Sequence, residues 1–507
     1  MRKWLPLVAI CAGTFMLLID VTIVSIALPA LAADLRTSFS SLQWVVDAYA
    51  LTLAALVLGA GSVADRIGHR RMFIAGLVVF ATSSLACGLA PGPGLLIGAR
   101  AVQGAGGAAM FATTFPLLNG SYSGRDRGTA YGIWGAVAGA SAALGPVLGG
   151  LLTQSLSWRW IFFVNPPVSI AVIALCWVLA DDRLRARGRV DVAGIVTLTG
   201  AAAAATYAMI RAGEHGWTAV ATWGLLVAAT VLGGVFALVE WRTAEPMLDL
   251  RLLRHRTFGG MLLAGFALNF AAFAYLTYTS IWLQSVLRMT PIDAGLASLP
   301  MSLTAFAVAG ASGRALHGVR PGRVVGAGLV LIGAGGLAGV ALVRGQASWP
   351  SLVAGFAIVG VGVGLVSPML GAATMSAVPR ERAGMGGGAV NMMRQLGYAF
   401  GVALLGTVFA SRAAAEIMGR GLPGAAGLAR ALAGGQARAV LKSSGTAAGP
   451  VNAAMHAASL VGLQGAFAVA GLVGIAAGLV VLVLVRGPQP SPEPQPQRQS
   501  QAQPSRA

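Results

Sequence analysis

Apolar residues in this chain gather in long blocks, which are separated by short segments rich in arginine and glycine. Each block holds about 20 residues or more, the length that a helix needs to cross a hydrocarbon core of roughly 30 Å. The pattern predicts fourteen membrane-spanning helices, near 6–31, 43–63, 72–90, 95–119, 128–153, 160–180, 191–211, 218–240, 258–286, 292–313, 323–343, 350–377, 384–411 and 459–485.

The composition agrees with a location in a membrane. Of 507 residues, 56% are hydrophobic and only 10% are charged. The net charge of +19 would also suit a nucleic-acid-binding protein, but the arginines lie in short loops where membrane orientation accounts for them. We therefore expect no nucleic-acid partner. A cleaved secretory signal is the alternative for the first block, although its length and an internal acid, Asp20, favour a retained helix.

Basic residues are distributed unevenly between alternate loops. If Met1 is cytoplasmic, the inner segments carry most of the arginines and the outer loops carry roughly one each. The outer segment 413–458 is an exception, and long loops escape this rule. The pattern predicts two cytoplasmic termini and a disordered Pro/Gln-rich tail over 487–507.

Two pairs of segments point to an internal duplication, which is frequent in transporters. The loop "GSVADRIGHRR" (61–71) is similar to "GASGRALHGVRPGR" (310–323), and an arginine opens a glycine-dense helix at both Arg127 and Arg382. The expected organisation is a six-helix bundle over 1–185, two inserted helices with linkers over 186–257, a second six-helix bundle over 258–486, and the tail.

Ionisable residues inside the blocks are the first candidates for function, because a charge at membrane depth is costly. Asp20 lies roughly 20 Å from the inner surface, and Arg100 and Asp47 lie roughly 9 and 6 Å below the outer surface, at 1.5 Å per residue. An Asp20–Arg100 or an Asp47–Arg100 pair would reduce the cost of burial. Asp20 is predicted to bind and release protons, with a helix-packing hydrogen bond as the alternative. For Asp47, an interfacial helix start is an equally good interpretation.

Polar and aromatic residues of the second half are candidates for a substrate cavity. Arg394 lies near the midplane without an acid in its half, which favours either an anionic or neutral polar substrate or a structural role for this arginine. The candidate cavity residues are Asn269, Tyr275, Tyr278, Asn391, Arg394 and Gln395.

Several motifs, in order along the chain, resemble those of the major facilitator superfamily. They are "GSVADRIGHRR" after helix 2, "LLIGARAVQGAGGAAM" (95–110) in helix 4 and "GAVAGASAALGPVLGG" (135–150) in helix 5. The segments "LLIDVTIVSIALP" (17–29), "LQWVVDAYAL" (42–51), "WRWIFFVNPP" (158–167) and "VNMMRQLGYAFGVALLGTV" (390–408) resemble the fourteen-helix drug:proton antiporter family of the EmrB/QacA type.

The resemblance implies a role for each motif. It assigns proton coupling to Arg100 in helix 4. It implies a cytoplasmic latch formed by Gly61, Asp65, Arg66, Gly68, Arg70 and Arg71. It implies an antiporter motif that seals or hinges the pathway, formed by Gly139, Gly145, Pro146, Gly149 and Gly150, where the residues alone fit ordinary small-residue packing equally well.

The function predicted from all of this is proton-coupled efflux of lipophilic, drug-like molecules across the cytoplasmic membrane by a monomer. No enzyme constellation, cofactor motif or metal-ligand spacing is found, and the absence of a P-loop indicates that a proton gradient supplies the energy. A proton-coupled importer of a metabolite is the first alternative, and a membrane protein that does not transport is the second.

Overall fold

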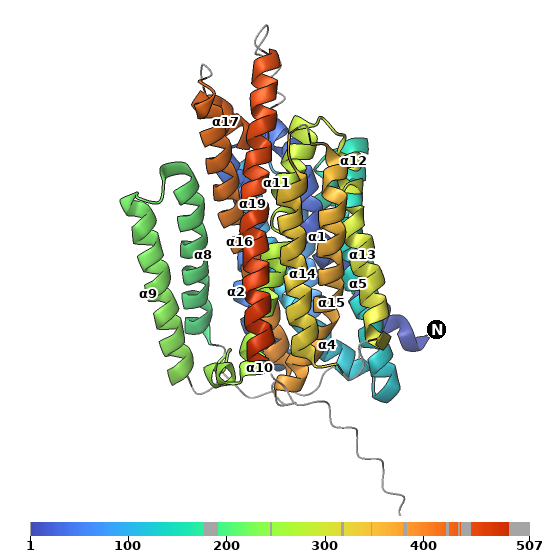
Figure 1. Cartoon of the computed structure of the whole chain (residues 1–507). Helices are drawn as coiled ribbons and strands as arrows, with labels where there is room; N and C mark the ends of the chain where they lie inside the picture. The colour runs from blue at the N-terminus through green and yellow to red at the C-terminus, as the bar shows by residue number, and fades with distance from the viewer. Residues whose placement is uncertain are drawn as a thin grey trace, which may run out of the picture.

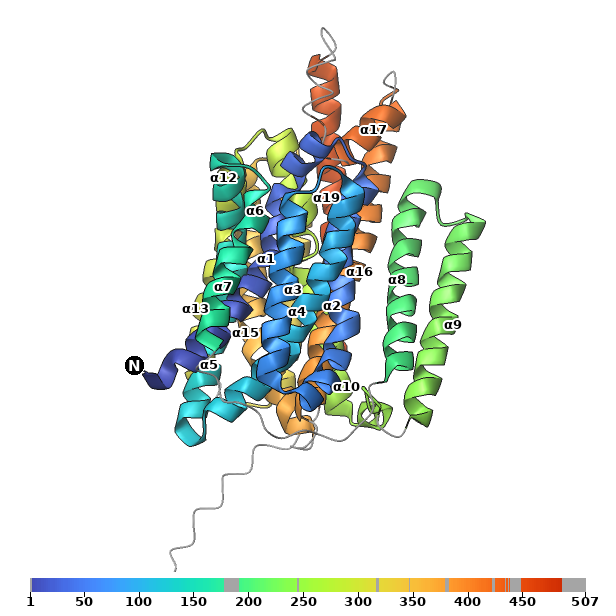
Figure 2. The same ribbon diagram turned by 180° about the vertical axis from the view of Figure 1, so that it is seen from behind.

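The computed structural model describes residues 2–176, 191–243, 246–315, 319–345, 347–378, 383–421, 425–433, 435, 437 and 448–485. The described chain is helical (Figures 1 and 2). In the first half the elements are η1 (Arg2–Trp4), α1 (Leu5–Leu35), α2 (Phe39–Ile67), α3 (His69–Gly88), α4 (Pro93–Ser121), α5 (Gly124–Ser155), α6 (Trp160–Phe163), α7 (Asn165–Cys176), α8 (Val192–His215) and α9 (Val220–Arg242). They continue as η2 (Leu250–Arg254), α10 (Arg256–Ala272), α11 (Leu276–Ile281), η3 (Trp282–Val286), α12 (Pro291–Leu296), α13 (Leu299–Ala315), α14 (Pro321–Leu342), η4 (Trp349–Leu352), α15 (Val353–Ala377), α16 (Ala383–Gly419), α17 (Ala425–Ala433) and α19 (Ala448–Leu484).

Each of the fourteen apolar blocks corresponds to helical structure. Within the described residues, twelve helices are long and apolar enough to cross a bilayer. The remaining two blocks are α5 and the shorter apolar helix Trp160–Cys176. The chain is therefore an all-helical, multi-pass membrane protein with about 12–14 membrane helices.

The helices of each half pack mainly against one another. In the first half, α4 packs against α2 and α3, and α1 packs against α5. In the second half, α14 packs against α15 and α19, and α10 packs against α16. Glycines allow the close approaches, because an added Cβ at Gly333 would lie 2.4 Å from the backbone oxygen of Gly471 in α19.

The two halves meet along two lines. The first is formed by α2 and α16, and the second by α5 with α12 and α13. Helix α8 packs against both α2 and α16, while α9 packs against α8 at the edge of the molecule (Figure 1). Thr407 of α16 donates a hydrogen bond of 2.7 Å to the backbone oxygen of Met209 in α8.

Two details differ from the sequence-based expectation: one helix is interrupted, and another begins earlier than predicted. The block 258–286 is interrupted rather than continuous: α10 ends at Ala272, and a π-helical segment, η3, follows α11. Gln284 lies within this π-helical segment and donates to the backbone oxygen of Ile26 in α1 at 2.7 Å.

The segment 413–458 contains helix, because it includes the end of α16, the whole of α17 and the start of α19. Helix α19 begins at Ala448 rather than near 459, since Asn452 and His456 lower the hydrophobicity of its first turns without breaking the helix. The predicted tail over 487–507 lies outside the described residues.

Candidate functional site

A buried ion pair joins α1 to α4. The guanidinium Nη1 of Arg100 contacts the carboxylate oxygen Oδ2 of Asp20, and both side chains are 1% exposed. Burying the two charges costs less when they are paired and hydrogen-bonded than when either stands alone. Of the two pairings that the sequence allowed for Arg100, the structure forms the one with Asp20.

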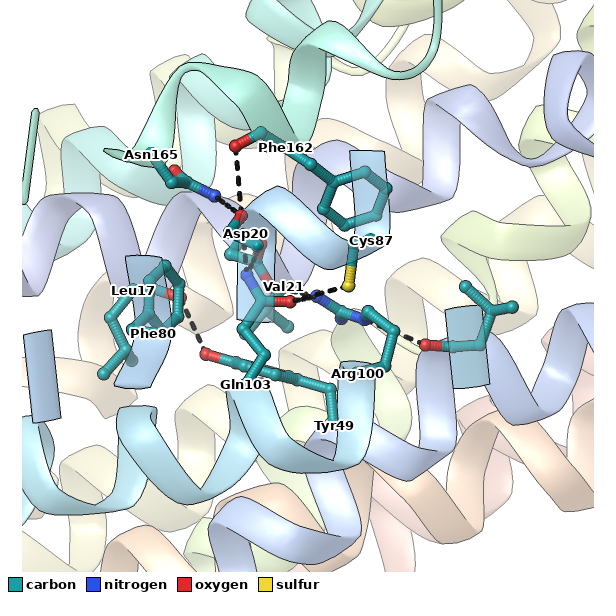
Figure 3. A network of polar contacts seen from close by, with 12 residues as sticks. Leu17, Asp20, Val21, Tyr49, Phe80, Cys87, Arg100, Gln103, Phe162 and Asn165 are labelled. Carbon is teal, nitrogen blue, oxygen red and sulfur yellow. Dashed lines mark hydrogen bonds and ion pairs between the residues drawn. The ribbon is translucent and has the colours of Figure 1, made fainter. Parts of the chain in front are cut away.

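Gln103 lies at the centre of the hydrogen bonds around this pair (Figure 3). Its side-chain oxygen accepts from Arg100 at 2.8 Å, and its side-chain nitrogen donates to the other carboxylate oxygen of Asp20 at 3.0 Å. The same nitrogen donates to Ser84 of α3, which also accepts from Asn165 of α7 at 2.8 Å. The pair is thus tied to α3 and α7 as well as to α1 and α4.

Helix α2 supplies further contacts of Arg100. Its Nε donates to the backbone oxygen of Val45 at 3.0 Å, and its guanidinium carbon lies 4.3 Å from the centre of the Tyr49 ring. The ring face attracts the cation, and the Tyr49 hydroxyl in turn donates to the backbone oxygen of Leu17. These contacts fix the guanidinium in one orientation toward α1.

Asp47 is buried without such partners. It is 0% exposed, and neither of its carboxylate oxygens has a hydrogen-bond partner in the described part of the chain. It follows Gln43 by one helical turn, and Gln43 donates to the backbone oxygen of Val402 in α16 at 3.3 Å. A buried carboxyl group without hydrogen-bond partners is rare in proteins, and this one belongs to the helix pair that joins the two halves.

A small cavity of about 20 Å³ lies between the halves, next to the Asp20 helix. It holds about one water molecule. Thr22 and Ser25 line it from α1, and Ser25 lies 3.4 Å from the Tyr398 hydroxyl of α16. Its described lining is apolar apart from hydroxyl groups: Thr22, Ser25, Ile26, Pro146, Phe273, Leu276, Thr279, Ser280, Leu283, Ala294, Ser298, Phe356 and Tyr398.

The six residues proposed for a substrate cavity lie elsewhere in the second half. Nε of Arg394 donates to the side-chain oxygen of Asn269 at 3.4 Å, so an amide partners this arginine. Tyr278 donates to the backbone oxygen of Val402, and Tyr275 stacks edge-on against Phe467. The remaining two candidates, Asn391 and Gln395, are both buried. Among the described lining residues of the small cavity, none of the six is found.

The residues predicted to form a latch surround the turn between α2 and α3. Gly68 has a φ of 96°, which glycine adopts without steric cost, and its N–H donates to the backbone oxygen of Ala64. The carboxylate of Asp65 lies 3.1 Å from Nε2 of His69. The other members flank this turn, with Gly61 and Arg66 in α2 and Arg70 and Arg71 in α3.

The glycines of the helix 5 motif mark where α5 approaches its neighbours most closely. A Cβ at Gly145 would lie 1.9 Å from the Thr22 hydroxyl, and one at Gly149 would lie 2.8 Å from the backbone oxygen of Ile23. A Cβ at Gly150 would lie 2.4 Å from the backbone oxygen of Pro291 in α12. Gly139 lies earlier in α5, and Pro146 lines the small cavity.

Gln103, Ser84 and Asn165 were not among the predicted site residues. Gln103 follows Arg100 by three residues, a spacing that places both side chains on one face of α4. That spacing could have identified it. Ser84 carries no comparable sequence signal, since serines are frequent in apolar helices.

The family model of the Major Facilitator Superfamily matches residues 10–402. This chain belongs to the major facilitator superfamily. The superfamily consists of membrane transporters rather than enzymes, and the motif resemblance to its fourteen-helix drug-efflux branch is confirmed by the relatives below.

Relatives of this major facilitator include antibiotic resistance proteins. The puromycin resistance protein pur8 of Streptomyces alboniger is 37% identical over 84% of this chain and 85% of its own length. The tetracenomycin C resistance and export protein of Streptomyces glaucescens is 33% identical over 95% of this chain and 91% of its own. The multidrug resistance protein Stp of Mycobacterium tuberculosis is 35% identical over 80% of this chain and 76% of its own.

A solved structure shares the fold of this major facilitator. It is a bacterial homologue of the human lysosomal transporter Spinster, described as inward-facing and unoccupied. The two are 15% identical with a TM-score of 0.64, over 96% of this chain and 99% of that one. The likeness establishes the major facilitator fold.

Replacing Gln103 with leucine is expected to destabilise the transporter. The change removes hydrogen bonds to Asp20, Arg100 and Ser84, and at about 0.6 kcal/mol for each bond in a membrane the loss is about 2 kcal/mol. Chemical unfolding of the purified protein in detergent measures it. Gln464→Leu is the control, because that amide donates one bond, to the backbone oxygen of Val343, and its loss is expected to be smaller. Equal losses in the two variants would contradict the central position of Gln103.

Proposed function

We propose that this protein exports lipophilic, drug-like or antibiotic molecules across the cytoplasmic membrane in exchange for protons. The relatives support the export of drugs, because their names describe resistance to puromycin, resistance to and export of tetracenomycin C, and multidrug resistance. Proton exchange is our own step beyond the relatives, and it depends on the buried acids.

The observation that carries the proposal is the Asp20–Arg100 pair beside the small cavity. Asp20 faces α4, while Thr22 and Ser25 of the same helix line the cavity. Protonation of Asp20 removes its negative charge and weakens its attraction for Arg100. A change in this pair therefore acts directly on the helix that would contact a substrate.

Exchange requires that proton and substrate favour different conformations, since a ligand shifts an equilibrium only by its differential affinity for the two states. In this mechanism, the paired form of Asp20 accompanies substrate binding, and the protonated form accompanies the return of the empty transporter. Asp47, at the α2–α16 contact, is the second candidate for proton binding.

The cavity chemistry supports a lipophilic substrate with hydrogen-bonding groups. Apolar side chains and hydroxyls line the cavity, and its described lining includes no charged group. At about 20 Å³ it is too small for a drug in this conformation, so the halves must separate there to admit one. Arg394, partnered by Asn269, lies outside this lining and acts as a structural anchor in this mechanism.

We place both termini in the cytoplasm and assign two six-helix bundles over 1–185 and 258–486, with α8 and α9 inserted between them. The arginine distribution supports this orientation. The residues of the turn at Gly68 then act as a cytoplasmic latch, and the glycines of α5 form the hinge or seal between the halves.

Drug accumulation in cells that lack their own efflux pumps tests the proposal. Expression of the protein is expected to lower the accumulation of puromycin, tetracenomycin C or lipophilic dyes, and a protonophore is expected to abolish the difference. In inverted membrane vesicles, uptake of the same compound should follow acidification of the lumen. Higher accumulation in expressing cells would indicate import, and an effect that survives the protonophore would contradict proton exchange.

A further inference from the structure

A second cavity lies at the edge of the molecule. The residues that line it are far from Asp20 in the sequence. Its volume is about 470 Å³, within the range of small-molecule sites. It lies between the last turns of α9 and the short helix η2. Its lining consists of Gly234, Ala237, Leu238 and Trp241 of α9 with Leu250, Arg251 and Arg254 of η2.

The cavity combines an apolar wall with two cations. The α9 side is formed by glycine, alanine, leucine and tryptophan, and η2 supplies Arg251 and Arg254, which are exposed. Within the described residues, no carboxylate lies within ion-pair distance of either guanidinium group. Two adjacent guanidinium groups favour an anion with several oxygen atoms, such as a phosphate group.

Hydrogen bonds hold η2 in place beside α9. Asp249 accepts from the backbone N–H of Arg251 at 2.9 Å, and Glu240 of α9 accepts from the backbone N–H of Leu248 at 3.0 Å. Leu252 is buried beneath the turn. The Asp249 and Glu240 side chains are buried, and each accepts one backbone N–H. Among the described residues, Arg251 and Arg254 are the charged lining of the cavity.

The cavity also opens onto surface that lipid must cover. Only 6% of the membrane window of α9 is buried within the protein, and Leu238 is 42% exposed. Trp241 is 75% exposed at the end of the helix, a position typical of tryptophans at the boundary between hydrocarbon and headgroups. Acyl chains would therefore lie along α9, directly next to the arginines.

We propose that this cavity binds one anionic phospholipid, with Arg251 and Arg254 on its phosphate group and its acyl chains along α9. The inference rests on the proposed orientation, which places η2 at the cytoplasmic leaflet, where anionic lipids attract basic residues. It is independent of the transport proposal, because neither α9 nor η2 contributes to the Asp20 network or to the small cavity.

Native mass spectrometry of the delipidated, full-length protein in detergent tests this site. The probes are phosphatidylglycerol, phosphatidylcholine with the same acyl chains, and inorganic phosphate. Wild type is expected to bind one molecule of phosphatidylglycerol. Its affinity for this lipid should be higher than its affinity for phosphatidylcholine. The double variant Arg251→Gln/Arg254→Gln is expected to bind phosphatidylglycerol about thirtyfold more weakly, because each basic residue contributes about fivefold to headgroup binding. Its affinity for phosphatidylcholine should not change.

The double variant Arg242→Gln/Arg256→Gln is the matched control. It removes two exposed arginines at the same end of the molecule that do not line the cavity, and it should bind as wild type does. If the pocket variant does not purify, each single variant is expected to lose about fivefold in affinity for phosphatidylglycerol. Equal binding by wild type and the pocket variants, or an equal loss in the control, would overturn the proposal. Displacement of phosphatidylglycerol by inorganic phosphate at equal concentration would show that the site binds a free anion rather than a lipid.

Discussion

Uphill export by the Asp20→Asn variant is expected to fall to the level of cells without the protein. Asparagine has nearly the same shape as aspartate and still accepts a hydrogen bond from Arg100, but it cannot exchange a proton at this position. Efflux from preloaded cells under an inward proton gradient measures the loss. Exchange of labelled for unlabelled substrate without a gradient should continue, because asparagine keeps the hydrogen bond to Arg100 that accompanies substrate binding in the proposed mechanism.

A double variant separates coupling from structure. Asp20→Asn leaves Arg100 charged and 1% exposed, and breaking a buried pair costs about 3–5 kcal/mol of stability. In Asp20→Asn/Arg100→Gln both charges are removed, so most of that stability is expected to return while uphill export stays absent. Recovery of uphill export in the double variant would show that the pair only stabilises the fold, and Asp47 would then be the acid to test.

Gly150→Ala is expected to separate α5 from α12 and to abolish transport. The new Cβ would lie 2.4 Å from the backbone oxygen of Pro291 and 2.7 Å from the Cα of Ile292, atoms that no side-chain rotation can move. Overpacking of this kind costs about 1–3 kcal/mol, enough to shift a two-state equilibrium about tenfold or more toward the state in which these helices are apart.

Cross-linking measures that shift. In a background with Gln154→Cys and Ile292→Cys, wild type should cross-link readily, because the Gln154 side chain accepts a hydrogen bond from the backbone N–H of Ile292 at 3.2 Å. Gly150→Ala should reduce the rate about tenfold. Gly98→Ala is the control, since an added Cβ at that helical glycine has no neighbour within 4 Å. Unchanged cross-linking in Gly150→Ala would mean that α5 and α12 do not part during transport.

That the chain has about 12–14 membrane helices could be read from the sequence, because a block of about 20 apolar residues is a strong signal. Depth along a helix was also informative: Asp20, Arg100 and Asp47 were expected in the same half of the membrane, and the first two are in contact. The choice between Asp20 and Asp47 was not possible, since the sequence gives the height of a residue but not the direction in which its helix turns it.

The same limit applies to the candidate cavity residues of the second half. Tyr275 and Tyr278 were candidates for a cavity because they are polar aromatics at mid-depth, yet both are buried in side-chain packing. Arg394 was expected to need an acid or a cavity, and an amide, Asn269, is its neighbour. Neither outcome follows from composition, because each depends on which residue a different helix brings to the same height.

Helix α8 makes the two lines of contact between the halves unequal as seen from the bilayer. It covers the α2–α16 line, where Ile195 lies against Gly59 and the Tyr207 ring lies 5.9 Å from that of Trp44. The backbone oxygen of Met209 accepts a hydrogen bond from Thr407. The α5–α12 line has no such cover among the described helices. A lipophilic molecule dissolved in the membrane therefore meets one covered line of contact, α2–α16, and one uncovered line, α5–α12. A transporter that took its substrate sideways from the lipid would admit it only along the α5–α12 line.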